Sequence, residues 1–118
     1  MKNKEATRAF SDEHEKSICK ALGGRKTSNS GANRFEKGDI IVENSSLLVE
    51  AKCSMSEKAS FSIKKEWLEK AKEEAFRNRL RDYCLCFNFE PDGKNYYVID
   101  EKLMMILSSA LFNFSKGN

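Results

Sequence analysis

Apolar residues recur at helical spacing in three segments of the chain. The clearest is 62–80, where charged side chains occupy the positions between them, as on an amphipathic helix. A second helix is predicted from Ser11, a good N-cap residue followed by two acids, to Leu22, where a glycine pair ends it. A third begins at an Asp100 cap and continues through Leu107. The inward face of the helix predicted over 62–80 is expected to comprise Ile63, Trp67, Leu68, Ala71, Ala75, Phe76 and Leu80.

Short apolar runs bounded by turn residues predict β-strands between the helices. The runs 39–43 and 47–53 are separated by a turn of small polar residues and are expected to form a hairpin. Two more follow at 83–89 and 95–99, and the basic segment 25–38 is predicted to be a loop with room for a short strand at its start. The order αβββαββα predicts an α/β domain with a central mixed β-sheet flanked by helices.

The length of 118 residues fits a single domain, 1–118, in which we expect 1–10 and 115–118 to be flexible. Hydrophobic residues make up 40% and charged residues 33%, which indicates a globular rather than a disordered chain. The beginning of the chain lacks the apolar core of a signal peptide, and the longest apolar stretches are too short to span a bilayer. The four cysteines are therefore expected to be free thiols in a cytoplasmic protein with no membrane partner.

The net charge of +3 is modest, but the charges are unevenly distributed. Residues 1–38 carry nine Lys or Arg against five Asp or Glu, and residues 63–81 carry seven against four. The segments 39–62 and 82–118 are each net −2. Basic segments flanking an acidic centre suit a protein that contacts phosphate at its edges and holds a divalent cation between them. They are equally consistent with two solvated charged faces.

The predicted hairpin brings charged residues together. With a two-residue turn at Asn44-Ser45, Asp39 lies directly opposite Glu50, and residues opposite each other on antiparallel strands share a face. Lys52, two residues beyond Glu50, shares that face. A slip of one residue in the pairing would separate Asp39 from Glu50, so the prediction depends on the register.

The neighbours of Glu50 and Lys52 are apolar on both faces, and an unpaired charge in such a strand is costly. One interpretation is an ion pair of Lys52 with Glu50 or Asp39 that has no functional role. The other is a metal site, in which the two carboxylates and the backbone carbonyl of Ala51 offer hard oxygen ligands to Mg²⁺ or Mn²⁺. Lys52 would then activate a water or stabilise the charge that develops on a phosphate.

The segments Gly38-Asp39 and Glu50-Ala51-Lys52 resemble the signature of the PD-(D/E)XK nuclease superfamily. A helix with Glu15-Lys16 and the loop Ser28-Asn29-Ser30-Gly31-Ala32 precede them, and a long helix and a strand follow. This order is similar to that of archaeal-type and phage Holliday junction resolvases, over roughly residues 10–107. The resemblance implies a restriction-endonuclease-like core.

Carried over from the resemblance, Asp39 and Glu50 are expected to be the metal ligands and Lys52 the catalytic lysine. Glu15 is expected to be the helix carboxylate that completes the metal centre, and Ser30 the loop serine beside the scissile phosphate.

The chain departs from the family pattern in two places. Gly38 replaces the usual proline, and Lys16 replaces the arginine that often follows the helix glutamate. Glu13 is a rival for the role of Glu15, although Glu15 fits better because it precedes Ile18 by one helical turn.

Basic residues that flank the site are candidate phosphate contacts, and simple solubilising charge is the alternative for each. They are Arg25, Lys26, Arg34, Lys37, Lys64 and Lys65. His14, the single histidine, is predicted to be a surface residue among acids, and Trp67 to belong to the core rather than to a base-stacking platform.

The resemblance implies Mg²⁺-dependent hydrolysis of phosphodiesters in branched DNA, with a four-way junction as substrate and a homodimer as the active assembly. The apolar tail 104–114 would supply part of the dimer interface or belong to the core. Three rival functions remain open. They are a PD-(D/E)XK endonuclease for duplex or flap DNA, an inactive DNA-binding module of the same fold, and a small α/β regulatory protein with an accidental Glu-x-Lys.

Overall fold

The computed structural model describes residues 4–27 and 39–117, and the side chains of Lys4 and Asp39 lie outside the described set. The helices are α1 (Lys4–Leu22), α2 (Lys65–Arg77) and α3 (Glu101–Gly117), with a 3₁₀ turn at Glu43–Ser45. The strands are β1 (Arg25–Lys26), β2 (Asp39–Val42), β3 (Leu47–Lys52), β4 (Asp82–Phe87) and β5 (Tyr96–Val98). The order αβββαββα is the one predicted from the sequence.

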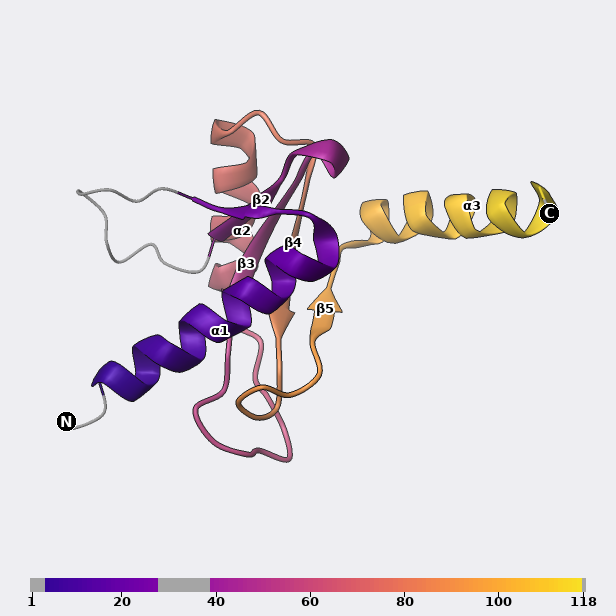
Figure 1. Ribbon diagram of the computed structural model, residues 1–118. Coiled ribbons are helices and arrows are strands. Elements are labelled where there is room, and N and C mark those ends of the chain that lie inside the picture. Colours follow the sequence, from indigo (N-terminus) through magenta and orange to yellow (C-terminus); the bar gives the residue numbers. More distant parts are fainter. Residues whose placement is uncertain (1–3, 28–38, 118) are drawn as a thin grey trace.

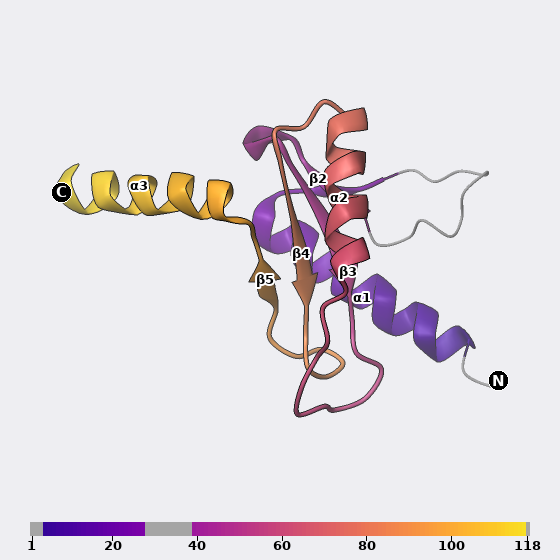
Figure 2. The ribbon, with the colours of Figure 1, turned by 180° about the vertical axis from the view of Figure 1, so that it is seen from behind.

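Within the described residues the strands form a five-stranded sheet in the order β1-β2-β3-β4-β5. β3 and β4 are parallel and are joined through α2, whereas the other neighbours are antiparallel. Figure 1 shows α1 across one face of the sheet, and the reverse view in Figure 2 shows α2 on the other face. The protein is therefore an α/β domain with a mixed sheet covered by helices, as predicted.

Side chains of β2 and β3 alternate between the two covered faces. The apolar cluster beneath α1 comprises Ile18, Ile40, Val42, Val49, Cys84 and Cys86. The cluster beneath α2 comprises Ile41, Leu48, Ala71 and Ala75. A slip of one residue would drive Glu50 into the apolar cluster beneath α1, so burial on both faces specifies the register.

Two helix boundaries differ from the prediction. α1 begins at Lys4, so most of the segment expected to be flexible forms its first turns, and the good helix formers Ala, Glu, Lys and Arg there explain the extension. α2 is shorter than 62–80. Phe76, predicted on its inward face, is 82% exposed, because it lies about 100° around the helix from buried Ala75.

α3 is attached to the body through its first turn. The Leu103 amide donates a hydrogen bond of 3.0 Å to Asp100 Oδ1, which confirms the predicted cap. Lys102 Nζ lies 3.5 Å from the carboxylate of buried Asp82, and Leu103 is buried. Beyond this turn α3 extends away from the sheet (Figure 1). None of the helices in residues 4–27 and 39–117 has the length and apolar run needed to cross a bilayer.

Candidate functional site

Asp39 and Glu50 are paired across β2 and β3, in the register predicted from the sequence. Lys52 lies two residues beyond Glu50 on the same face, and Phe87 of β4 is its partner in the parallel ladder. The three positions therefore meet at the end of the sheet where β2 begins and β3 ends. They lie on the face that α2 covers.

Glu50 is a buried carboxylate with incomplete hydrogen bonding. It is 1% exposed, although it lies on a central strand among apolar residues. Its Oε2 is 3.5 Å from Lys52 Nζ, and its Oε1 is 3.7 Å from Lys70 Nζ. Among the described residues, no group donates a hydrogen bond to Oε1. A buried carboxylate oxygen in this state is an unusual feature of a folded protein, and a ligand role is one explanation for it.

Lys70 of α2 is a site residue that the sequence analysis did not select. Its side chain is 36% exposed and reaches Glu50 from the helix that covers this face. Lys70 directly precedes buried Ala71 and follows Trp67 by one turn, so it borders the buried stripe of α2. A lysine next to an inward-facing stripe was the available signal, but its partner on β3 could be identified only from the fold.

Trp67 lies beside the catalytic candidates rather than within the core. Its ring centroid is 4.6 Å from Lys52 Nζ and 5.7 Å from Lys64 Nζ, distances typical of cation–π contacts. Phe61 is 6.2 Å from the Trp67 ring and stacks on Phe87 at 4.8 Å. Trp67 is half-buried, and its indole restrains the Lys52 ammonium at the edge of the site.

The end of β3 is held by two buried hydrogen bonds. The Ser54 amide donates to Asn88 Oδ1, and the Ser54 hydroxyl donates to the Asn88 carbonyl, each at 2.8 Å. Both residues are buried, and Asn88 follows directly on β4 whereas Cys53 separates Ser54 from β3. These bonds fix the backbone that carries Lys52, which lies two residues before Ser54.

Glu15 is buried and Glu13 is exposed, so Glu15 is the carboxylate that faces inward, as expected. Its Oε1 is 3.5 Å from Lys26 Nζ of β1. Lys26 pairs with Ile40 in the ladder and so lies on the α1 face. Glu15 and Glu50 therefore lie at the same end of the sheet but on opposite faces, and the structure does not group Glu15 with Glu50 and Lys52.

The basic candidates differ in their surroundings. Arg25 lies 2.8 Å from Glu43, and Lys26 lies 3.7 Å from Asp12 in addition to its contact with Glu15. Lys65 is exposed and lies 3.9 Å from Glu69. The pairs with Glu43, Asp12 and Glu69 are solvent-accessible, and exposed ion pairs of this kind are weak.

The remaining DNA-contact candidates, Ser30, Arg34 and Lys37, lie outside the described residues. Lys64 immediately precedes α2, and its contact with Trp67 places it beside Lys52. Among the DNA-contact candidates in the described residues, Lys64 is the one that the structure brings beside Lys52.

The cysteines are free thiols. Burial raises the pKa of Cys84 and of Cys86 to about 12, so both remain neutral near pH 7. Neither has the depressed pKa of a nucleophilic thiol.

His14 is buried, and the prediction of a surface residue was wrong. α1 packs its His14 side chain onto β4, with Nε2 3.6 Å from Cys86 Sγ. Burial lowers the pKa of His14 below its ordinary value, and a hydrogen bond with Asn95 opposes part of this shift. The histidine is therefore expected to be neutral near pH 7 in the folded protein.

A lowered His14 pKa makes the folded state less stable in mild acid. The unfolded chain binds the proton below about pH 6.5, so the unfolding free energy should fall as the pH decreases through that value. Thermal unfolding of wild type and His14→Gln between pH 7.5 and 5.5 measures this effect. We expect a smaller decrease in Tm for His14→Gln. An equal decrease in the two proteins would contradict a lowered pKa of His14 in the folded state.

The donor set at Glu50 fits a hard divalent cation. Glu50 contributes a buried carboxylate with a free acceptor position, Ala51 a backbone carbonyl, and Asp39 a second carboxylate at the paired register position. The described side chains alone contain no group of three or more His, Cys, Asp or Glu that could hold a metal ion, and the Asp39 side chain lies outside them.

Comparisons with protein-family models, with curated proteins and with solved structures found no significant match to the chain. The class that the fold itself defines is an α/β domain with a mixed five-stranded sheet. The site on it is a buried glutamate flanked by two lysines.

Proposed function

We propose that the protein is a Mg²⁺-dependent DNA endonuclease of the PD-(D/E)XK class with a restriction-endonuclease-like core. The observation that carries this proposal is Glu50, a fully buried carboxylate with an unsatisfied oxygen in the middle of a Glu-x-Lys strand. A purely structural ion pair would be expected to complete its hydrogen bonds, since unsatisfied buried acceptors are costly. The observed register, with Asp39 opposite Glu50, supports the same reading.

Glu50, Asp39 and the Ala51 carbonyl are the groups that would hold the cation. When bound, Mg²⁺ supplies a Lewis acid that polarises the scissile phosphate and acidifies water. Lys52 keeps its ammonium next to Glu50, held there by Trp67, and places a positive charge where negative charge develops on the phosphate. The proposal also includes Glu15, which would contact the DNA or the metal from the α1 face of the sheet, opposite the face that carries Glu50 and Lys52.

The basic residues would position DNA across the end of the sheet. Lys64 and Lys65 stand at the start of α2, where the helix dipole also favours a phosphate. Arg25 and Lys26 lie on the edge strand β1 and would exchange their exposed carboxylate partners, Glu43 and Asp12, for phosphates. Contacts of this kind give affinity that falls steeply with salt.

A four-way DNA junction is the proposed substrate, and this choice rests on the family resemblance. Such a junction has two symmetry-related strands to cut, so the activity calls for two copies of the site in a C₂ homodimer. The test is cleavage of a labelled four-way junction and of its linear arms in Mg²⁺. Paired nicks in the junction alone are expected. Equal cleavage of the duplex arms would retain the nuclease and remove the junction specificity, in favour of a duplex or flap endonuclease.

Lys70 is expected to compensate the Glu50 charge when no metal is bound. Lys70→Met should lower the unfolding free energy in EDTA by on the order of 1 kcal/mol, because one of two cations beside a buried carboxylate is lost while the lysine itself is partly exposed. Mg²⁺ should reverse most of this loss, since a ligand that binds only the folded state stabilises it.

Thermal unfolding with EDTA and with Mg²⁺ measures both effects. Lys72→Met is the matched control, because Lys72 is an exposed lysine on the same helix. If Lys70→Met is destabilised equally with and without Mg²⁺, the Lys70 ammonium and the metal ion do not compensate the same charge on Glu50.

A further inference from the structure

The surface of α3 is apolar on all sides. Between Leu103 and Phe114, Asn113 and a central Ser108-Ser109 pair are the polar residues. Seven large apolar side chains of this helix are 40% to 70% exposed. They are Met104, Met105, Ile106, Leu107, Leu111, Phe112 and Phe114. A helix that is hydrophobic all round is normally buried, and no other part of the described chain covers this one.

The exposed apolar area is large enough for a protein interface. At roughly 200 Å² for each large apolar side chain, the seven residues leave about 800 Å² in contact with water. The largest apolar patch on an ordinary monomer is about 300–600 Å². About 800 Å² is also what each partner buries in an interface of standard size. The side that carries Ile106, Leu107, Leu111 and Phe114 accounts for about half of this area, so a dimer would also need to bury surface on the body of the protein.

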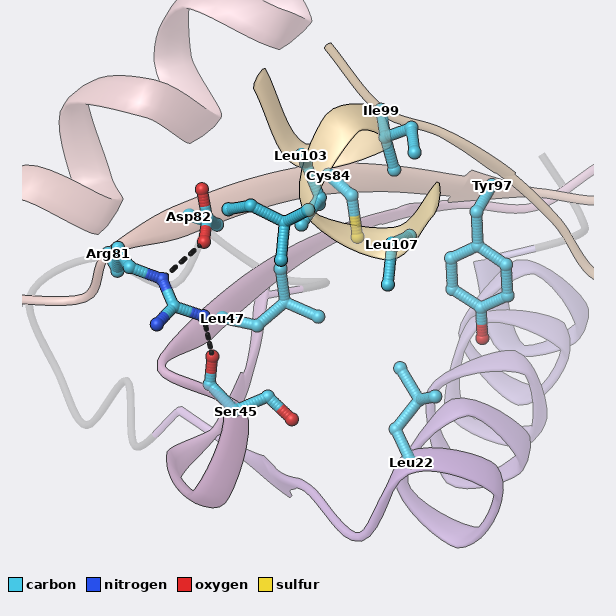
Figure 3. Close-up of a pocket in the computed structure, with 11 residues that line it drawn as sticks. Leu22, Ser45, Leu47, Arg81, Asp82, Cys84, Tyr97, Ile99, Leu103 and Leu107 are labelled. Atoms are coloured by element: carbon cyan, nitrogen blue, oxygen red, sulfur yellow. Dashed lines mark hydrogen bonds and ion pairs between the residues drawn. The ribbon is translucent and has the colours of Figure 1, made fainter. Parts of the chain in front are cut away.

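An apolar pocket of about 420 Å³ lies at the base of α3. Figure 3 shows Leu103 and Leu107 of α3 on one side of it, close to Cys84 of β4, and Leu22 of α1 on the other side. A cavity of about 150 Å³ holds a benzene-sized group, so this pocket has room for two large side chains. The apolar surface of α3 therefore continues into a hollow in the body of the protein.

The sequence of α3 is complementary to itself in the antiparallel direction. With a two-fold axis between Ser108 and Ser109, Leu103 of one copy is level with Phe114 of the other, and Ile106 is level with Leu111. Next to the axis, Leu107 of one copy is level with Ala110 of the other, and both lie on the side of the helix that carries Leu103 and Phe114.

We propose that α3 is the dimerisation element, pairing antiparallel with α3 of a second copy. In this arrangement the distal residues Leu111 and Phe114 of each copy enter the pocket at the base of the other copy's helix. The contact is isologous and closes on itself, as a two-fold interface requires. The inference goes beyond DNA cleavage and stands on the exposed helix and the pocket, so it can fail or succeed independently of the nuclease proposal.

The mass of the protein in solution, without DNA or metal, is the first test. Wild type at tens of micromolar should sediment as a dimer, and Leu111→Glu as a folded monomer. Phe76→Glu is the matched control, because Phe76 is a large exposed apolar residue on α2, away from α3. A monomeric wild type, including one that instead binds phospholipid vesicles, would overturn the proposal, as would a dimer that Leu111→Glu leaves intact.

Discussion

Glu50→Gln should abolish DNA cleavage, with a loss of roughly 10³-fold or more in rate. The substitution keeps the shape of the side chain and removes the negative charge that would hold a divalent cation. Glu50 is 1% exposed, and its Oε1 accepts no hydrogen bond from the described residues. The glutamine amide therefore breaks no hydrogen bond when it replaces this oxygen. We expect the variant to fold and to bind junction DNA, because the proposed phosphate contacts are lysines and arginines elsewhere on the domain.

Glu73→Gln is the matched control for this loss. Glu73 lies on α2, is exposed, and forms an ion pair with Arg77 at 3.1 Å. Cleavage of a labelled junction under single-turnover conditions should be unchanged by Glu73→Gln. Activity in Glu50→Gln within a few-fold of wild type would show that this carboxylate does not carry the reaction.

Lys52→Met is expected to reduce cleavage by about 10²- to 10³-fold, the usual cost of removing one group that stabilises transition-state charge. Lys52 Nζ lies 3.5 Å from Glu50 and 4.6 Å from the Trp67 ring centroid, so its ammonium is held at the site. Methionine retains the apolar part of the side chain and removes the ammonium together with its cation–π contact with Trp67. The loss should therefore appear in the rate of the chemical step, with little change in DNA affinity.

Lys65→Met provides the comparison on the same face. Lys65 is exposed and lies next to Glu69, so it can contribute to DNA affinity but not to the chemical step. Single-turnover rates at saturating protein separate the two effects. If Lys52→Met weakens DNA binding and leaves the saturated rate unchanged, Lys52 is a phosphate contact and not a catalytic group.

The register of the hairpin could be predicted from sequence because both faces of β2 and β3 are buried. Alternation of the buried faces requires a pairing that keeps Asp39 and Glu50 on a common face, and the turn at Asn44-Ser45 then places them opposite each other. The extent of the contact between α2 and the sheet was harder to predict from the sequence. The periodic pattern continues through Phe76, but the contact with the sheet is made by Ala71 and Ala75. Periodicity indicates an apolar stripe and does not show how wide the contact will be.

The composition of the site was only partly predictable. Helical spacing showed that Glu15 faces inward, but it could not show which face of the sheet α1 covers, and this decides its distance from Glu50. Lys70 and Trp67 reach the site because the crossover from β3 to β4 lays α2 over Glu50 and Lys52. Such contacts depend on tertiary packing between distant segments, which local sequence patterns do not encode.

The most direct test of the proposed site is whether Glu50 binds a divalent cation. Electron paramagnetic resonance of free Mn²⁺, titrated with wild type and with Glu50→Gln in the absence of DNA, measures this binding. We expect wild type to remove Mn²⁺ from the free signal and Mg²⁺ to compete for the same site, with binding lost in Glu50→Gln. Equal Mn²⁺ binding by the two proteins, or none by wild type, would instead mean that Glu50 serves only as the partner of Lys52 and Lys70.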